Sequence, residues 1–96
     1  QAARRLGLDI ELKPADFDND GTFIGAGYGI PSPEGLNALR TLARSEGILL
    51  DPVYTSKALA GLFAHAADGR LDGEAIFLHT GGNPALFAYA QDVLSG

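Results

Sequence analysis

The chain has 96 residues, a formal net charge of −5 and an apolar fraction of 46%, which fits one globular domain or part of one. Twelve acidic residues outnumber seven scattered basic ones, so no nucleic acid partner is expected, and the absence of cysteine excludes disulfides and thiolate sites. No apolar run approaches the roughly 18–20 residues that span a bilayer. No membrane partner is therefore expected, and a cytoplasmic location is the default.

The first residues have the pattern of a helix that is ending. Gln1–Leu6 favours helix, and Gly7 suits the left-handed position that follows a last helical turn. A helix without a start signal, in a sequence without methionine, predicts that these 96 residues are part of a longer protein. Such a part would expose apolar faces that need the missing portion of the fold.

The next segments predict one strand, a long loop and one helix. Apolar and acidic residues alternate over 8–12, which indicates a short half-buried strand, and residues 14–32 are rich in Gly, Asp and Pro. Ser32 as N-cap and Pro33 in the first turn predict a helix that ends at Gly47.

The second half alternates between helices and apolar runs. A helix of small and apolar residues is predicted over about 55–67, followed by an apolar strand over 74–79 that is typical of a parallel sheet. A last helix is expected from Asn83 to about Leu94. The order β, loop, α, α, β, α belongs to a layered α/β domain.

An acidic motif in the loop matches the start of a calcium-binding loop. Three aspartates alternate from Asp16 to Asp20 and Gly21 follows them, as in an EF-hand. The motif then requires a glutamate where Gly27 stands, and Pro14 blocks the preceding helix. We therefore expect a solvated acidic turn here and no metal site.

Two other features can contact a ligand. Tyr28 stands in a glycine-rich loop and Tyr54 precedes a helix, so each is either a ligand contact or a packed anchor. His79–Gly82 follows a predicted strand and precedes a predicted helix start, where α/β folds bind anions and cofactors. A plain turn that uses glycine for positive φ explains the same segment equally well.

Three motifs together resemble the D-cysteine desulfhydrase and 1-aminocyclopropane-1-carboxylate deaminase family of pyridoxal-phosphate enzymes. They are Gly27–Pro31 (GYGIP), Glu46–Lys57 (EGILLDPVYTSK) and His79–Tyr89 (HTGGNPALFAY), in the family's order. The resemblance covers nearly the whole chain and implies the C-terminal part of a three-layer, parallel-sheet catalytic fold similar to the tryptophan synthase β subunit. It also implies that residues 1–96 need the N-terminal portion of the same enzyme, and a homodimer is expected.

The resemblance assigns candidate site residues. Tyr28 and Tyr54 are similar to the two family tyrosines that flank the substrate, and are the catalytic candidates. Thr80 is similar to the residue beside the pyridine nitrogen of pyridoxal 5′-phosphate; with Thr55 and Gly81 it forms the predicted cofactor-binding set.

Neither lysine of this chain matches the family's Schiff-base lysine, which is expected outside it. Lys57 is interpreted as structural or as the partner of a carboxylate, and Ser56 stands where the family leads us to expect glycine. The chain alone is therefore expected to be inactive.

The implied activity is a lyase that converts D-cysteine to pyruvate, sulfide and ammonia. The cyclopropane deaminase is the alternative. The resemblance implies Glu and Leu in that branch at the two positions where this chain has Thr80 and Thr55, and a hydroxyl tunes the cofactor ring less than a carboxylate. A non-catalytic binding domain derived from the same fold is the second alternative.

Overall fold

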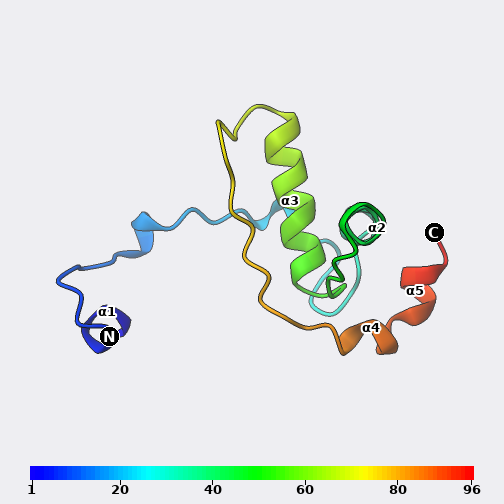
Figure 1. The fold of residues 1–96 in the computed structure, drawn as a ribbon, viewed down its shortest axis with the longest axis horizontal. Helices are drawn as coiled ribbons and strands as arrows, with labels where there is room; N and C mark the ends of the chain where they lie inside the picture. The colour runs from blue at the N-terminus through cyan, green and yellow to red at the C-terminus, as the bar shows by residue number, and fades with distance from the viewer.

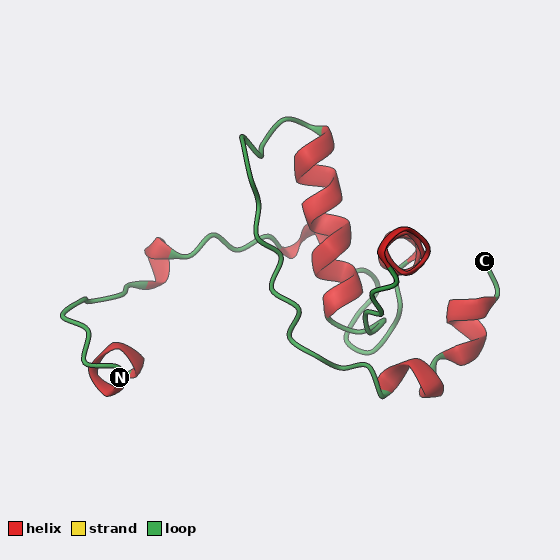
Figure 2. Ribbon diagram, in the orientation of Figure 1, coloured by secondary structure: helices red, strands yellow, loops and turns green.

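A computed structural model describes all 96 residues as helices joined by loops (Figure 2). Two helices form the centre, and the N-terminal segment extends away from them as an arm (Figure 1). None of the helices is both long and apolar enough to cross a membrane. In chain order the elements are α1 (Ala2–Arg5), the 3₁₀ turns η1 (Pro14–Asp16) and η2 (Gly21–Phe23), α2 (Pro33–Glu46), α3 (Thr55–Ala67), α4 (Ala85–Ala88) and α5 (Ala90–Leu94).

The predicted helix signals at α1 and α2 are confirmed. Gly7 adopts a φ of 68° after α1, as its predicted place beyond the last turn requires. At the start of α2, the Ser32 hydroxyl accepts a hydrogen bond from the Gly35 amide at 3.1 Å. Gly47 ends α2 with a φ of 67°, where a side chain would be strained.

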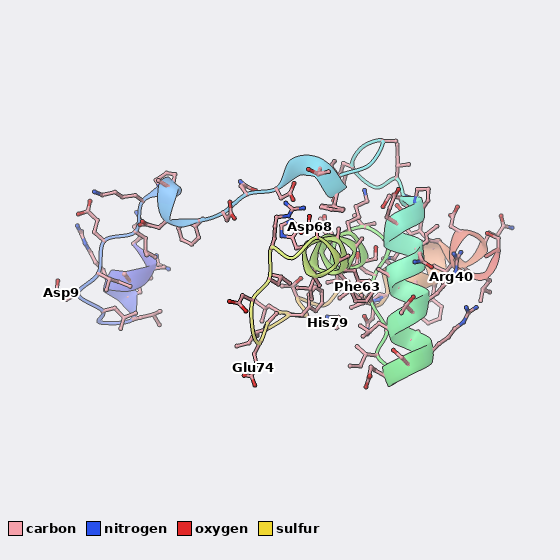
Figure 3. The ribbon with its side chains drawn as sticks, turned by 90° about the horizontal axis from the view of Figure 1, so that it is seen from above. Asp9, Arg40, Phe63, Asp68, Glu74 and His79 are labelled. Atoms are coloured by element: carbon pink, nitrogen blue, oxygen red, sulfur yellow. The ribbon has the colours of Figure 1, made fainter.

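The core lies where α2 and α3 cross. Figure 1 shows α2 end-on with α3 in the plane, and Figure 3 shows the reverse, so the two helices cross steeply. Five apolar residues are buried there: Ala38, Leu39, Leu50, Leu59 and Ala60. This small core fixes the start of α3 relative to α2, and the candidate site is built around that start.

The predicted strands over 8–12 and 74–79 are absent from the structure, and with them the parallel sheet expected of this fold class. Both segments are extended, but neither forms a ladder of backbone hydrogen bonds. A strand exists only against a neighbouring strand, and no other segment of this chain lies in register with either one. Ile76 is consequently 96% exposed and Leu78 77% exposed.

The single helix expected over 83–94 is divided into α4 and α5. The division falls at Tyr89, whose backbone leaves the helical range at φ −110° and ψ 22°. The Tyr89 hydroxyl donates to the Gly29 carbonyl at 2.7 Å, so a tertiary contact prevails over helix propensity here. Arg40 of α2, labelled in Figure 3, holds α5 by donating to the Val93 and Asp92 carbonyls.

A buried hydroxyl lies without a partner where α2 and α3 meet. A Cβ on Gly35 would lie 3.1 Å from Ser56 Oγ, so the glycine lets the two helices approach closely. Ser56 is completely buried and its hydroxyl makes no hydrogen bond. An unsatisfied buried hydroxyl lowers stability.

We expect Ser56→Ala to raise the free energy of unfolding by about 1 kcal/mol, because it removes that unsatisfied group without enlarging the side chain. Urea denaturation of the protein that contains this chain measures the change. Ser45→Ala is the matched control, since its hydroxyl is exposed and a change below about 0.5 kcal/mol is expected. A loss of stability in Ser56→Ala would show that the hydroxyl has a partner.

Candidate functional site

The structure brings the two predicted catalytic tyrosines together. Tyr28 comes from the glycine-rich loop before α2 and Tyr54 from the residue before α3, yet their hydroxyls form a short hydrogen bond. Their ring centroids are 5.9 Å apart and the planes are inclined by 61°. Tyr28 is 80% exposed and Tyr54 56% exposed, so both phenols face outward and are open to a ligand.

The contact makes Tyr54 a weaker acid. Its hydrogen bond with Tyr28 raises the pKa of the Tyr54 phenol above the usual 10, and partial desolvation raises it further. The nearby Tyr28, Asp51 and Tyr89 act in the same direction. Tyr54 carries its proton at neutral pH, as a tyrosine ordinarily does, and can donate or relay it.

An open groove of about 660 Å³ runs beside the tyrosine pair along α3. Tyr28, Tyr54 and Lys57 line one part of it, and the remaining walls are largely apolar side chains that include Phe23 and Phe77. A groove with apolar walls and a few convergent polar groups is the usual form of a small-molecule site.

The Asp51 carboxylate caps the N-terminus of α3, where Tyr54 is the residue before the first turn. One oxygen, Oδ2, accepts the backbone N–H groups of Val53 at 2.8 Å and Tyr54 at 2.7 Å. The other, Oδ1, accepts the Thr55 backbone N–H at 2.9 Å and the Thr55 hydroxyl at 2.6 Å. A carboxylate at this position satisfies amides that the helix itself leaves free.

Asp51 is completely buried and still ionised at neutral pH. Burial on its own raises the pKa of the carboxyl, but the hydrogen bonds from Thr55, Tyr54 and Val53 outweigh it and leave the pKa below the usual 3.8. The negative charge is thus a permanent part of this helix start.

Of the predicted cofactor residues, Thr55 is buried and hydrogen-bonded within the chain, whereas Thr80 and Gly81 are exposed. Thr55 is only 2% exposed, and its hydroxyl donates to Asp51 Oδ1 and accepts a hydrogen bond from the Asp51 backbone N–H. Thr80 is exposed, and its hydroxyl makes no hydrogen bond within the chain. Gly81 has open space where a Cβ would stand.

The segment that carries Thr80 is fastened to Asp51 and its neighbours. His79, labelled in Figure 3, donates from Nε2 to the Leu49 carbonyl at 2.7 Å, and its Nδ1 accepts the Gly81 amide at 3.1 Å. A Cβ on Gly82 would lie 2.8 Å from Asp51 Cγ, so only glycine fits there. Asp51 therefore contacts both the Tyr54 end of α3 and the turn that follows Thr80.

Lys57 has the structural role expected of it, but its partners are not carboxylates. Its ammonium donates to the carbonyls of Ile24 at 2.7 Å and Gly27 at 3.1 Å. Sequence reasoning did not single out the function of Asp51, His79 or Tyr89. An aspartate just before a helix was the available signal for Asp51, whereas the other two act through contacts with distant segments.

The family model for pyridoxal-phosphate dependent enzymes matches residues 1–81. The chain belongs to this family. It is 48% identical to the D-cysteine desulfhydrase of Serratia proteamaculans (strain 568) over 93 residues, 95% of this chain and 27% of that protein. A crystal structure of an ACC deaminase homologue matches with a TM-score of 0.78 at 39% identity, covering 98% of this chain and 28% of the other.

These matches confirm the resemblance that the three motifs predicted. The chain spans about a quarter of the length of both relatives, 27% of one and 28% of the other. The match to the solved structure also shows that the helices of this chain are arranged as in that protein.

The residues present fit the edge of a pyridoxal phosphate ring. A pyridine nitrogen needs a hydrogen-bond donor, and Thr80 offers an exposed hydroxyl that no group of the chain uses. Gly81 and Gly82 have φ values of 100° and 90° and carry no Cβ, so the backbone allows a flat ligand to approach. Thr80 and this turn would hold the ring edge.

We expect Asp51→Asn to lower the free energy of unfolding at pH 7 by about 2 kcal/mol, because an amide nitrogen would face donors that now bind a carboxylate. The folded-state pKa of Asp51 is depressed, so its contribution is present above the unfolded pKa of about 3.8 and is lost as the pH falls below that value. The measurement is denaturation of wild type and variant at pH 7 and near pH 3.

The difference between the two proteins should shrink at the lower pH. Glu34→Gln, on an exposed position of α2, is the control and should change stability by less than about 0.5 kcal/mol. A difference that is equal at both pH values would show that the Asp51 charge does not contribute.

Proposed function

We propose that the chain is the C-terminal part of a pyridoxal-phosphate dependent lyase that converts D-cysteine to pyruvate, sulfide and ammonia. The single observation that carries this proposal is the hydrogen-bonded Tyr28–Tyr54 pair, which places two phenol hydroxyls together on one open face. The 48% identity to a D-cysteine desulfhydrase supports the choice of substrate.

The tyrosine pair would handle the protons and the substrate carboxylate. When bound, pyridoxal phosphate supplies an electron sink that makes the α-proton of the substrate easier to remove. Tyr54 holds a proton on its phenol and can give it to a departing thiolate, and the hydrogen bond with Tyr28 keeps this phenol oriented. The apolar groove beside them would exclude water from the reacting atoms once the N-terminal portion of the enzyme covers its open side.

Thr80 would donate its hydroxyl hydrogen to the ring nitrogen, beside the open backbone of Gly81. A neutral hydroxyl leaves the ring a weaker electron sink than a carboxylate would, which suffices for the loss of a thiolate. Thr55 would belong to this cofactor-binding face by holding Asp51, and through it the turn at Gly82, in place.

Other parts of the enzyme would lie outside this chain. Lys57 is occupied by loop carbonyls, so the lysine that binds the cofactor covalently would come from the N-terminal portion. Strands from that portion would pair with residues 74–79 and complete the parallel sheet. A homodimer, a cytoplasmic location and the inactivity of the chain on its own stay predictions.

A cyclopropane deaminase is the second candidate, favoured by the 39% identity to an ACC deaminase homologue. Opening a cyclopropane demands more carbanion stabilisation than losing a thiolate. Two threonines at positions 55 and 80 supply less of it than a carboxylate, which favours the desulfhydrase activity.

The test is turnover of D-cysteine and of 1-aminocyclopropane-1-carboxylate by the full-length holoenzyme, with Tyr54→Phe as the variant. Pyruvate and sulfide should form from D-cysteine. Tyr54→Phe should lower that turnover by roughly 10²-fold or more, because it removes only the hydroxyl that transfers the proton. Its free energy of unfolding should change by about 1 kcal/mol or less.

Ser45→Ala, which removes an exposed hydroxyl of α2, should keep full turnover. Faster turnover of the cyclopropane substrate would establish the second candidate, and turnover of neither substrate would favour the non-catalytic domain. Equal activity of Tyr54→Phe and wild type would reduce Tyr54 to a packing residue.

A further inference from the structure

The loop that carries Tyr28 has little internal structure to hold it. Gly25 and Gly29 adopt φ values of 74° and 72°, which any other residue would resist. One long backbone hydrogen bond, from the Ile30 amide to the Gly27 carbonyl at 3.3 Å, closes the turn. A segment with so few backbone hydrogen bonds opens easily unless other groups fasten it.

Lys57 fastens the first half of this loop. Lys57 is 8% exposed, and its ammonium donates to the carbonyls of Ile24 and Gly27 at 2.7 and 3.1 Å. No carboxylate forms an ion pair with Lys57, so these carbonyl dipoles are the groups that compensate its desolvation. Gly25 lies close by, since a Cβ on it would stand 4.0 Å from Lys57 Nζ.

Tyr89 fastens the other side of Tyr28. Its hydroxyl donates to the Gly29 carbonyl at 2.7 Å, and a Cβ on Gly29 would lie 3.5 Å from the Tyr89 hydroxyl oxygen. The carbonyls on either side of Tyr28, those of Gly27 and Gly29, are thus bound by side chains from two different helical segments. This contact also accounts for a tyrosine at the break between α4 and α5.

We propose that Lys57 and Tyr89 are positioning residues that clamp the backbone on both sides of Tyr28 and so hold its hydroxyl against Tyr54. Neither clamp residue needs to touch the substrate. Lys57 lies one helical turn after Tyr54 in α3, so a single rigid element carries one tyrosine and fixes the loop of the other. The catalytic consequence rests on the function proposed above, whereas the clamp itself does not.

The test compares Lys57→Met and Tyr89→Phe in the full-length holoenzyme by amide hydrogen exchange and by steady-state kinetics with D-cysteine. Met keeps the unbranched shape of lysine without its donors, and Phe keeps the ring without the hydroxyl. Exchange over residues 24–30 should rise by roughly 10-fold in each variant, with α2 and α3 unchanged. The kcat should fall by roughly 10-fold while KM changes less, because Tyr28 is present but loosely held.

Lys13→Met is the matched control, because the other lysine lies on the exposed N-terminal arm and should leave exchange and kcat unaltered. The clamp is overturned if residues 24–30 exchange at the wild-type rate in Tyr89→Phe, or if exchange in that variant rises equally throughout α2 and α3. Tyr89→Phe keeps the test decisive should Lys57→Met fail to fold. Wild-type protein that does not turn over D-cysteine would refute the proposed function, and the exchange data would still decide the clamp.

Discussion

A buried carboxylate organises the candidate site. Asp51 accepts hydrogen bonds from three consecutive amides and from the Thr55 hydroxyl, and it is completely shielded from water. A buried charge is tolerable only when its oxygens are satisfied, so the start of α3 has little freedom to move. Tyr54 stands on this start and Gly82 packs against the same carboxylate. The proposed proton-transfer side and the proposed cofactor side of the site are therefore held by one group.

Much of the apolar surface that this chain carries is left uncovered. Its radius of gyration is 15.5 Å, against about 12.5 Å for a compact domain of this length. Only five apolar residues are fully buried, while Ile76, Phe87 and Leu94 are each more than four-fifths exposed. The groove along α3 is likewise open on one side. These features agree with the proposal that a larger portion of the enzyme completes the core and closes the site.

Local signals in the sequence predicted the helices that they govern. Ser32 marks the start of α2 and Gly47 marks its end. A cap hydroxyl and a left-handed glycine act within a few residues of the helix ends, so both could be recognised in the sequence. The prediction of a strand over 74–79 was wrong for this chain, because a strand forms only against a partner strand that the segment itself does not contain. The prediction of one continuous helix over 83–94 was wrong for a similar reason, since Tyr89 hydrogen-bonds to the carbonyl of Gly29, sixty residues away.

The candidate site shows the same division. Tyr28, Tyr54 and Thr80 were proposed from a family resemblance. Composition and spacing alone allowed the tyrosines to be packing residues and the Thr80 segment to be a plain turn. Their surroundings could not be predicted, because the contact of Asp51 with Gly82 and that of Lys57 with Gly27 join segments about thirty residues apart. Thr55 illustrates the limit, since its neighbour Asp51 occupies the hydroxyl assigned to the cofactor-binding set.

The most direct test of the central role of Asp51 is the coupling free energy between Gly82→Ala and Asp51→Gly in a double-mutant cycle. With Asp51 present, the new Cβ would lie 2.8 Å from Asp51 Cγ and 2.9 Å from Asp51 Cβ, and Gly82→Ala should cost about 2 kcal/mol or more of unfolding free energy. Glycine at position 51 removes both atoms, so only the backbone strain at positive φ is left, about 1 kcal/mol. Our account predicts a coupling of about 1 kcal/mol or more. Costs that add within about 0.5 kcal/mol would contradict it.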